Sequence, residues 1–192
     1  MKKLIFLLFI QSAFSQIEKN IGDFQELKVL DGINVVLEKG EQNVLKITGD
    51  NTENVVITNK SGSLIIRMQL VKKLKGQNTV VKLTHKSRIF LIEAKEGATV
   101  ISKDKTDQST IYLKTASGGQ IDLDIQTEKA TATANSGGVI NLKGTTFSFE
   151  ATVKSGSIVK AYELNSSQTK VKLHPAVHVK LMQEIFLKPT PL

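Results

Sequence analysis

The chain contains no cysteine and no tryptophan, and aromatic residues make up only 5% of its 192 residues. Without cysteine there is no disulfide and no thiol for lipid attachment near an export signal. A lipoprotein is therefore excluded, and packing alone must stabilise the fold. Apolar residues account for 40% and charged residues for 23%, as in an ordinary globular domain. A core of Val, Ile, Leu, Ala and Thr favours flat, repeated β packing.

Arginine is scarce in a chain that is otherwise basic. Of the 26 basic residues, only Arg67 and Arg88 can make bidentate contacts with base edges. The formal charge of +8 falls to +6 if Lys2 and Lys3 leave with a signal peptide. We therefore expect no nucleic-acid partner. The densest basic run, residues 71–76, is most simply a solvated turn, and its other reading is attraction to acidic glycans or anionic membrane surfaces.

Only one long hydrophobic run occurs, and it lies at the N-terminus. The first fifteen residues, MKKLIFLLFIQSAFS, combine two lysines, seven apolar residues and the small residues Ala13 and Ser15. This pattern predicts a signal peptide over residues 1–15, cut before Gln16. An uncleaved anchor is the alternative, but the run is far shorter than the roughly 20 residues that span a bilayer. We expect export to the periplasm, the outer-membrane surface or the extracellular space, with no membrane span after cleavage.

The rest of the chain reads as short β segments separated by turn residues, with no sustained helical period. Apolar runs at 33–37, 44–47, 55–57 and 64–66 are punctuated by Gly40, by residues 49–51 and by Ser61-Gly62. A less regular segment, 69–78, follows. Strands resume at 80–83 and 89–92, and no stretch resembles a domain linker.

A repeat of 19 residues occupies the C-terminal half. ASGGQIDLDI, NSGGVINLKG and KSGSIVKAYEL place their serines at Ser117, Ser136 and Ser155, and Glu96-Gly97-Ala98 reads as an earlier, degenerate copy. Apolar residues recur two and four positions before each serine and four and six after it. Each repeat is thus two short strands joined at a Ser-Gly corner, each with one inward face.

A simple hairpin conflicts with this pattern. A Gly118-Gly119 hairpin pairs Thr115 with Asp122, so the apolar sets point to opposite sides. A coil of one turn per repeat has no such conflict, because equivalent positions stack about 4.8 Å apart. We therefore predict an all-β fold, a single-stranded parallel β-helix with rungs of about 19 residues in the C-terminal half. An antiparallel β-sandwich is the alternative. The β-helix requires that Ile121, Ile140 and Val159 align in one row.

The stretch LDGINVVLEKGEQNVLKITGDNTENVVITNKSGSLII, followed by VVKLTHKSRIFLIEAKEGATVIS and the SGG repeats, resembles the bacterial head GIN domain family. Members of that family are labelled autotransporter adhesins, and the triplet Gly32-Ile33-Asn34 carries its name. The resemblance covers about residues 24–173. It implies an exported β-helical domain of the cell envelope, which we place at residues 16–173, and it supplies no catalytic residues.

The last segment, 174–192, departs from the repeat. A further Ser-Gly corner is due at position 174, where the chain instead reads His174-Pro175-Ala176-Val177. The codons for Leu-His-Pro-Ala-Val, read one base early, can spell Ala-Ser-Gly-Gly. We therefore expect a frame-shifted or truncated tail, which resequencing of the gene tests. The alternative is a genuine terminal strand, since Val177, Val179 and Leu181 alternate.

Candidate chemical groups are few. Asp122 and Asp124 share one strand face, but the equivalent positions in the next repeats hold Asn141 and Lys143, then Lys160 and Tyr162, so no acidic cluster accumulates. Ser117, Ser136 and Ser155 form a row of hydroxyls without a histidine to activate them. His174 and His178 on a strand lie about 13 Å apart, too far to share an ion, and His85 stands alone. Asn165-Ser166-Ser167 matches a glycosylation pattern, which means little in a bacterial protein.

These observations predict no catalytic residue, no cofactor and no metal, and they leave the ligand-binding residues unknown. The leading hypothesis is a non-enzymatic, adhesin-like module that binds a glycan, an envelope component or a protein through repeated shallow contacts. A polysaccharide-cleaving β-helix enzyme of the lyase kind is the alternative from another class. A purely structural envelope protein is a third hypothesis.

Overall fold

The computed structural model describes residues 17–69 and 78–174. Within those residues the chain is almost entirely β-strand, with one 3₁₀ turn, η1, and no α-helix. The predicted signal peptide, the basic run at 71–76, His178 and the rest of the tail lie outside the described residues. The elements are β1 (Ile17–Asn20), β2 (Glu26–Val29), β3 (Asn34–Lys39), β4 (Val44–Gly49), η1 (Thr52–Asn54), β5 (Val55–Lys60), β6 (Ser63–Met68), β7 (Thr79–His85), β8 (Leu91–Lys95), β9 (Thr99–Ser102), β10 (Thr106–Asp107), β11 (Thr110–Ala116), β12 (Gln120–Ala134), β13 (Val139–Val153) and β14 (Ile158–Leu173).

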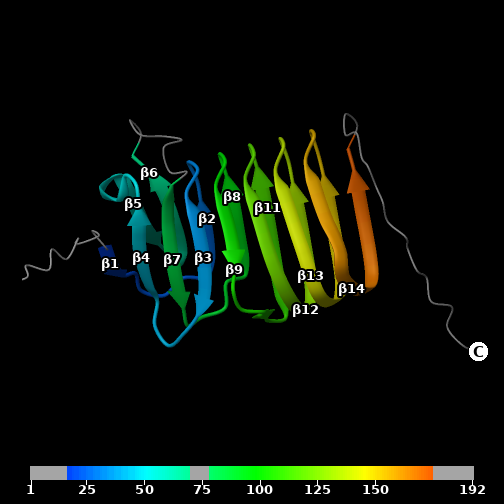
Figure 1. Cartoon of the computed structure of the whole chain (residues 1–192). Helices are drawn as coiled ribbons and strands as arrows, with labels where there is room; N and C mark the ends of the chain where they lie inside the picture. The colour runs from blue at the N-terminus through cyan, green and yellow to red at the C-terminus, as the bar shows by residue number, and fades with distance from the viewer. Residues whose placement is uncertain (1–16, 70–77, 175–192) are drawn as a thin grey trace, which may run out of the picture.

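The strands form one 14-stranded sheet that folds back on itself into two layers (Figure 1). Layer A contains β1, β4, β7, β3 and β9, followed by the first halves of β12, β13 and β14. Layer B contains β5, β6, β2, β8 and β11, followed by the second halves of the same three long strands. Each long strand crosses from layer A to layer B, so it covers both sides of one turn. The result is a β-solenoid of about four turns, with β1 and β14 at opposite ends.

The stacking is parallel and in register where the repeat predicts it. Ile121 of β12 pairs with Ile140 of β13, and Ile140 pairs with Val159 of β14. The inward row that the β-helix requires is therefore present, and the fold prediction is confirmed. The rungs also continue upstream of the repeats, because β9 and β3 extend the same row through Val100 and Val35.

The end of the solenoid around β1 and β5 is antiparallel, which the parallel β-helix prediction did not contain. β1 pairs with β4, β4 with β7, and β5 with β6, all antiparallel. The turn between β5 and β6 is Ser61-Gly62, with φ of 50° and 80°. Two successive positive φ values match the twist of a tight hairpin, and here the two flanking strands do pair with each other.

The Ser-Gly corners are tight turns rather than wide bends. Ser117 has φ of 50° and Gly118 has φ of 75°. The N–H of Gly119 donates to the carbonyl of Ala116 at 3.0 Å. These are the features of a type I′ turn. The strands on its two sides nevertheless diverge into layers A and B. In each layer, a strand pairs with the equivalent strands of the preceding and following coils of the solenoid. The prediction that the strands beside each corner do not form a hairpin is therefore confirmed, although the turn itself is of hairpin type.

One further corner of this kind was missed in the sequence. Asp31 and Gly32 have φ of 60° and 78°, and the N–H of Ile33 donates to the carbonyl of Leu30 at 3.4 Å. This corner stacks on the corner formed by Glu96 and Gly97. Glu96 and Gly97 have φ of 54° and 74°, which confirms the prediction that they form an earlier, degenerate copy of the Ser-Gly corner. The triplet Gly32-Ile33-Asn34 therefore contributes a glycine to a corner, a fully buried isoleucine to the core and the first residue of β3.

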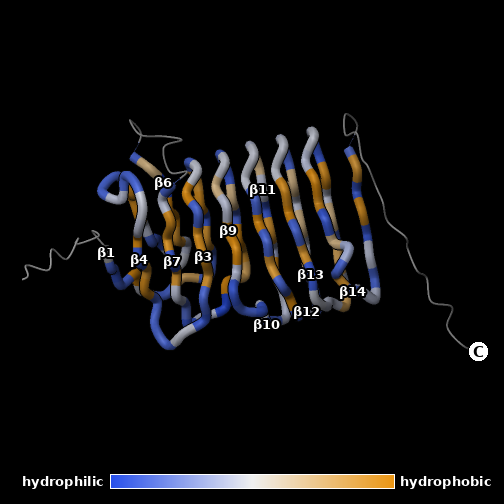
Figure 2. Tube along the Cα trace, viewed as in Figure 1, coloured by the Kyte–Doolittle hydropathy of each residue, from blue (hydrophilic) through white to orange (hydrophobic). Residues whose placement is uncertain are grey.

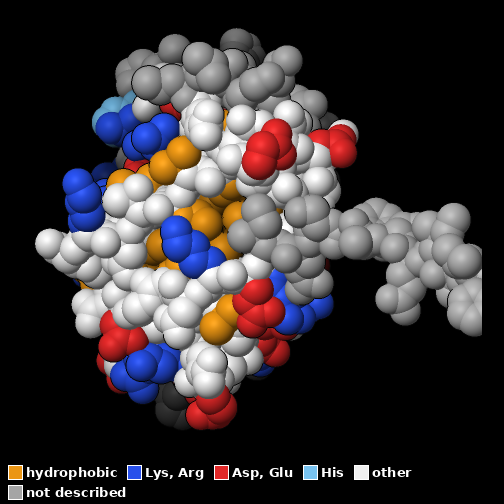
Figure 3. Space-filling model, turned by 90° about the vertical axis from the view of Figure 1, so that its left-hand side faces the viewer, with side chains coloured by type: hydrophobic (Ala, Val, Ile, Leu, Met, Phe, Trp, Pro, Cys, Tyr) orange, Lys and Arg blue, Asp and Glu red, His pale blue; other side chains and the backbone are white. Residues whose placement is uncertain are grey.

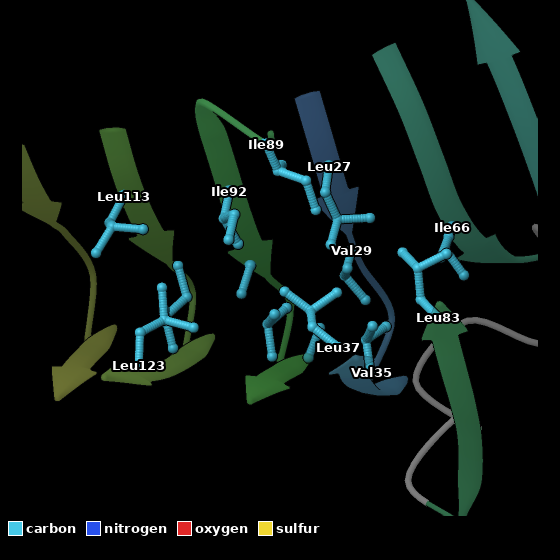
Figure 4. Packing of buried hydrophobic residues seen from close by; sticks show 14 of the residues in the cluster. Leu27, Val29, Val35, Leu37, Ile66, Leu83, Ile89, Ile92, Leu113 and Leu123 are labelled. Atoms are coloured by element: carbon cyan, nitrogen blue, oxygen red, sulfur yellow. The ribbon is translucent and has the colours of Figure 1, made fainter. Parts of the chain in front are cut away.

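The core lies between the two layers and runs the length of the solenoid. Apolar and polar residues alternate along the strands (Figure 2), as expected when one face of each strand is buried. Figure 4 shows side chains from both layers meeting in the interior, among them Leu113 opposite Leu123 and Val29 near Val35. The end of the molecule that carries β1 shows apolar side chains at its centre with a basic side chain lying over them, and further charged side chains toward its rim (Figure 3).

Candidate functional site: the outer faces of the two layers

The outer faces of layers A and B are the surfaces on which a partner can act, because the inward side chains are committed to the core. Parallel stacking places outward residues of successive strands in rows that run along the solenoid axis. On layer A, one row contains Asp122, Asn141 and Lys160. The amide of Asn141 donates to Asp122 Oδ2 at 3.5 Å. An amide and a lysine therefore follow Asp122, as the sequence predicts.

The neighbouring row differs from the prediction at one position. Asp124 and Lys143 are paired, but the partner of Lys143 in β14 is Glu163 and not Tyr162. An irregularity in the β13–β14 register after Asn141 inserts one residue and shifts the rest of β14. The row contains Lys143 between Asp124 and Glu163, and Asp124 lies 4.0 Å from Lys105 Nζ. The two acids are separated by a cation and do not form a carboxylate pair.

The corner serines act through their backbone. Ser117, Ser136 and Ser155 are exposed and hold positive φ. The carbonyl of Ser117 accepts from the N–H of Gly97 at 3.1 Å, and that of Ser136 accepts from Gly118 at 3.2 Å. This row of hydrogen bonds joins consecutive corners along the axis. The prediction that these serines are corner residues is consistent with this geometry.

The histidines do not come together within the described residues. His85 Nδ1 lies 2.8 Å from the carbonyl oxygen of Ser87, at the end of β7. His174 follows β14, and its backbone N–H donates to the carbonyl of Val153 at 3.2 Å. In the part of the chain that the structure describes, no three His, Asp or Glu side chains are placed to hold a metal ion.

The bend where each long strand passes from layer A to layer B carries a row of hydroxyls. Thr127 donates to Thr146 at 3.0 Å, and Thr146 donates to the carbonyl of Ser148 at 3.2 Å. Ser166, in the Asn165-Ser166-Ser167 stretch, is the next member of the row and donates to the carbonyl of Gln168 at 2.8 Å. These hydroxyls satisfy backbone acceptors at the bend, which gives the row a structural role.

The two outer faces differ in charge, and the sequence analysis missed this difference. On layer A the outward strand residues carry five acids and four lysines, whereas on layer B they carry eight basic residues and three acids. Those of layer A are Glu18, Glu38, Asp122, Asp124, Glu163, Lys46, Lys82, Lys143 and Lys160. Those of layer B are Lys28, Lys60, Arg67, Lys95, Lys114, Lys129, Lys170, Lys172, Glu26, Glu93 and Glu150.

Lysines lower the pKa of several surface carboxyls. Hydrogen bonds from Lys103 and Lys82 hold the pKa of Glu38 below its ordinary value of 4.5. The hydrogen bond and charge of Lys172 lower the pKa of Glu150 in the same way. A carboxyl whose folded pKa is lowered contributes stability that is present above its unfolded pKa and lost as pH falls through the folded value. Because both carboxyls are partly exposed, this contribution is small, and its loss is confined to acid solution below about pH 4.5.

Replacing both lysines beside Glu38 tests this assignment. Lys82 and Lys103 lie 2.6 Å and 2.5 Å from its carboxylate oxygens. In a Lys82→Gln, Lys103→Gln double variant we expect the pKa of Glu38 to rise toward 4.5. A carboxyl-detected NMR titration measures it directly. Lys46→Gln is the matched control, since Lys46 pairs with Glu18 and not with Glu38. A Glu38 pKa that is the same in the double variant and the parent contradicts the assignment.

None of the described residues forms a helix of the length and hydrophobicity needed to cross a bilayer. The stacked corners, the in-register apolar rows and the antiparallel end together define an all-β solenoid domain with two broad outer faces. Residues 23–182 match the family described as "Putative auto-transporter adhesin, head GIN domain", and the chain belongs to that family. The resemblance noted in the sequence is thereby confirmed.

Solved structures with the same fold come from Bacteroides and Parabacteroides species. A putative adhesin from Bacteroides fragilis superposes with a TM-score of 0.76 at 15% identity, covering 85% of this chain and 78% of that one. A putative adhesin from Parabacteroides merdae gives 0.65 at 17% identity, covering 83% and 77%. A putative lipid binding protein from Parabacteroides distasonis gives 0.63 at 16%, covering 83% and 78%. At these identities the likeness establishes the fold alone. Among curated proteins the search gave no match.

Proposed function

We propose that this protein is a non-enzymatic binding module of the bacterial cell envelope, adhesin-like in action. It presents the outer faces of a β-solenoid to a glycan, an envelope component or another protein. Membership of a family described as adhesin heads supports a binding role, as do structural neighbours named as adhesins or as a lipid binding protein.

The observation that carries the proposal is the arrangement of the outward side chains in flat, regular rows. Parallel pairing from β8 through β14 lines up the outward side chains along the axis at the strand spacing of about 4.8 Å. Such a surface offers many weak, evenly spaced contacts, which suits a polymeric or repetitive partner. It does not gather unlike catalytic groups around one reacting atom, which nucleophilic or acid–base catalysis requires.

Incubation with polysaccharides tests the non-enzymatic part of the proposal. The purified protein is mixed with neutral and acidic polysaccharides, with and without calcium, and both retention on the immobilised polymer and release of unsaturated or reducing ends are measured. We expect retention on at least one polymer and no release of product. Product release that depends on the protein would establish the lyase-like alternative and contradict the proposal. If the protein is retained on none of the polymers and binds nothing in envelope extracts, a purely structural role is favoured.

Export and domain limits are part of the same proposal. We propose that residues 1–15 are removed as a signal peptide, that 16–173 form the binding domain and that 174–192 are an atypical tail. N-terminal sequencing of the protein recovered from the envelope or the medium should begin at Gln16. A protein recovered only from the cytoplasm, or one still beginning at Met1, contradicts the export step.

A further inference from the structure

The outer face of layer B carries an excess of positive charge that its own acids do not neutralise. Its three carboxylates each pair with a lysine of the same face: Glu26 with Lys28 at 2.9 Å, Glu93 with Lys95 at 2.7 Å and Glu150 with Lys172 at 2.6 Å. The remaining basic residues of the face form no ion pair within the described residues: Lys60, Arg67, Lys114, Lys129 and Lys170. Five cations are therefore available to an external partner.

Three of these cations lie in the part of the face built by the long strands. Lys114 is on β11, Lys129 on β12 and Lys170 on β14, and all three are exposed. From β11 to β14 the strand spacing separates Lys114 and Lys170 by about 14 Å along the axis. Hydrogen bonds from Lys28 and Lys172 are the main cause of the lowered pKa of Glu26 and Glu150, and the charges of Lys114, Lys170 and Lys129 add to it. The positions of the three exposed lysines spread positive charge over several turns of the solenoid.

Most of the outward residues between these lysines bear hydroxyls, with Glu150 between Thr131 and Lys170 as the exception. Thr131 and Thr133 of β12 and Ser148 and Thr152 of β13 occupy the outward positions of the same face. Tyr112 of β11 is 39% exposed beside Thr131 and two residues from Lys114. An exposed phenol ring offers an apolar surface with a polar edge, and hydroxyls donate and accept hydrogen bonds. Cations, hydroxyls and an aromatic ring on a flat surface suit the chemistry of a charged sugar polymer.

We propose that the outer face of layer B binds an acidic polysaccharide, through contacts of Lys114, Lys129 and Lys170 with its carboxylates. This inference rests on the proposed binding function and names its ligand class. An anionic membrane is a poorer fit, because the face has rows of hydroxyls and, among the residues that the structure describes, no protruding apolar segment to enter the lipid. A nucleic acid is a poorer fit because only Arg67 on this face offers bidentate geometry.

Polygalacturonate and its fully methyl-esterified form are the probes, since they share one backbone and differ in charge. The full-length protein is tested for binding to each polymer by biolayer interferometry. We expect binding to the acid and none to the ester. Raising the salt concentration from about 20 mM to about 500 mM should abolish binding to the acid, because salt screens the attraction between exposed charges. Equal binding to both polymers, or binding that is insensitive to salt, would overturn the inference.

Matched triple variants locate the binding to one face. Lys114→Gln, Lys129→Gln, Lys170→Gln should weaken binding about ten-fold, since exposed charge contacts are individually modest. Lys82→Gln, Lys143→Gln, Lys160→Gln removes the same charge from layer A and should change binding less than about two-fold. Equal losses in both triples would show that net charge alone acts and would overturn the inference while leaving the binding function intact.

Two further outcomes separate this inference from the function on which it rests. Vesicles containing phosphatidylglycerol, retained more strongly than polygalacturonate, would replace the polysaccharide with a membrane and overturn the inference alone. Cleavage of polygalacturonate by the protein would overturn the non-enzymatic function itself.

Discussion

A Gly119→Ala variant is expected to lose about 3 kcal/mol of the free energy of unfolding. A Cβ built at Gly119 falls 2.1 Å from the carbonyl oxygen and 2.5 Å from the carbonyl carbon of Ala94. Both atoms belong to the backbone of β8, which is paired on each side and cannot withdraw without disturbing the sheet. Urea denaturation followed by circular dichroism measures the loss.

Gly118→Ala is the matched control, one residue away in the same corner. A Cβ at Gly118 has no atom within 4 Å, but its φ of 75° is unfavourable for alanine, so we expect a loss of about 1 kcal/mol. The equivalents of Gly119 in other turns include Ala98 and Ser157, whose side chains are accommodated by their own surroundings; Ser157 Oγ donates to the carbonyl of Ala134 at 2.7 Å. Equal losses at 118 and 119 would show that backbone strain and not close approach sets the cost.

The C-terminal half of the fold is predictable because one local rule repeats there. A 19-residue period with apolar residues on both sides of each Ser-Gly pair leaves few ways to bury every inward side chain. The rows Ile121–Ile140–Val159 and Leu123–Leu142 follow from that rule alone. The corner at Glu96 and Gly97 was also found, since its spacing from Ser117 is close to the repeat.

The N-terminal half follows no such rule, because its spatial neighbours are far apart in the chain. The corner at Asp31 and Gly32 stacks on that of Glu96 and Gly97, although some 65 residues separate them. The chain between them builds the antiparallel end and then returns to layer B with β8. Antiparallel pairing of β4 with β7 depends on which strand edges remain free after the parallel turns have stacked. Local hydrophobic patterns carry no information on that choice.

The charge difference between the two faces likewise requires the register. Lysines are spread over the whole sequence, and the only cluster visible in it, residues 71–76, lies outside the described residues. Lys114, Lys129 and Lys170 are 15 and 41 residues apart in the chain, but pairing of β11, β12, β13 and β14 puts them on one face. Because of a one-residue irregularity in β14, the neighbour of Lys143 is Glu163 and not the expected Tyr162. Such insertions shift every later contact and leave no mark in the apolar pattern.

An Ile121→Ala variant is expected to lose about 3 to 4 kcal/mol of stability, because it opens a cavity between two occupied turns. Ile121 is fully buried, with Val100 on the turn before it and Ile140 on the turn after it. Neither neighbour can collapse into the space without breaking its own in-register pairing. The urea midpoint measures the loss, and hydrogen exchange should show faster opening of β9, β12 and β13 together.

Val159→Ala removes apolar atoms from the same row at β14, which pairs only with β13 among the described strands. Val159 is only partly buried, so its truncation should cost about 1 kcal/mol or less. In a solenoid each turn contacts only its neighbours, so the cost of truncating a row depends on how many turns flank the site. Equal losses at Ile121 and Val159 would mean that the row does not act as a stack of coupled layers, and that the stability of the molecule resides elsewhere.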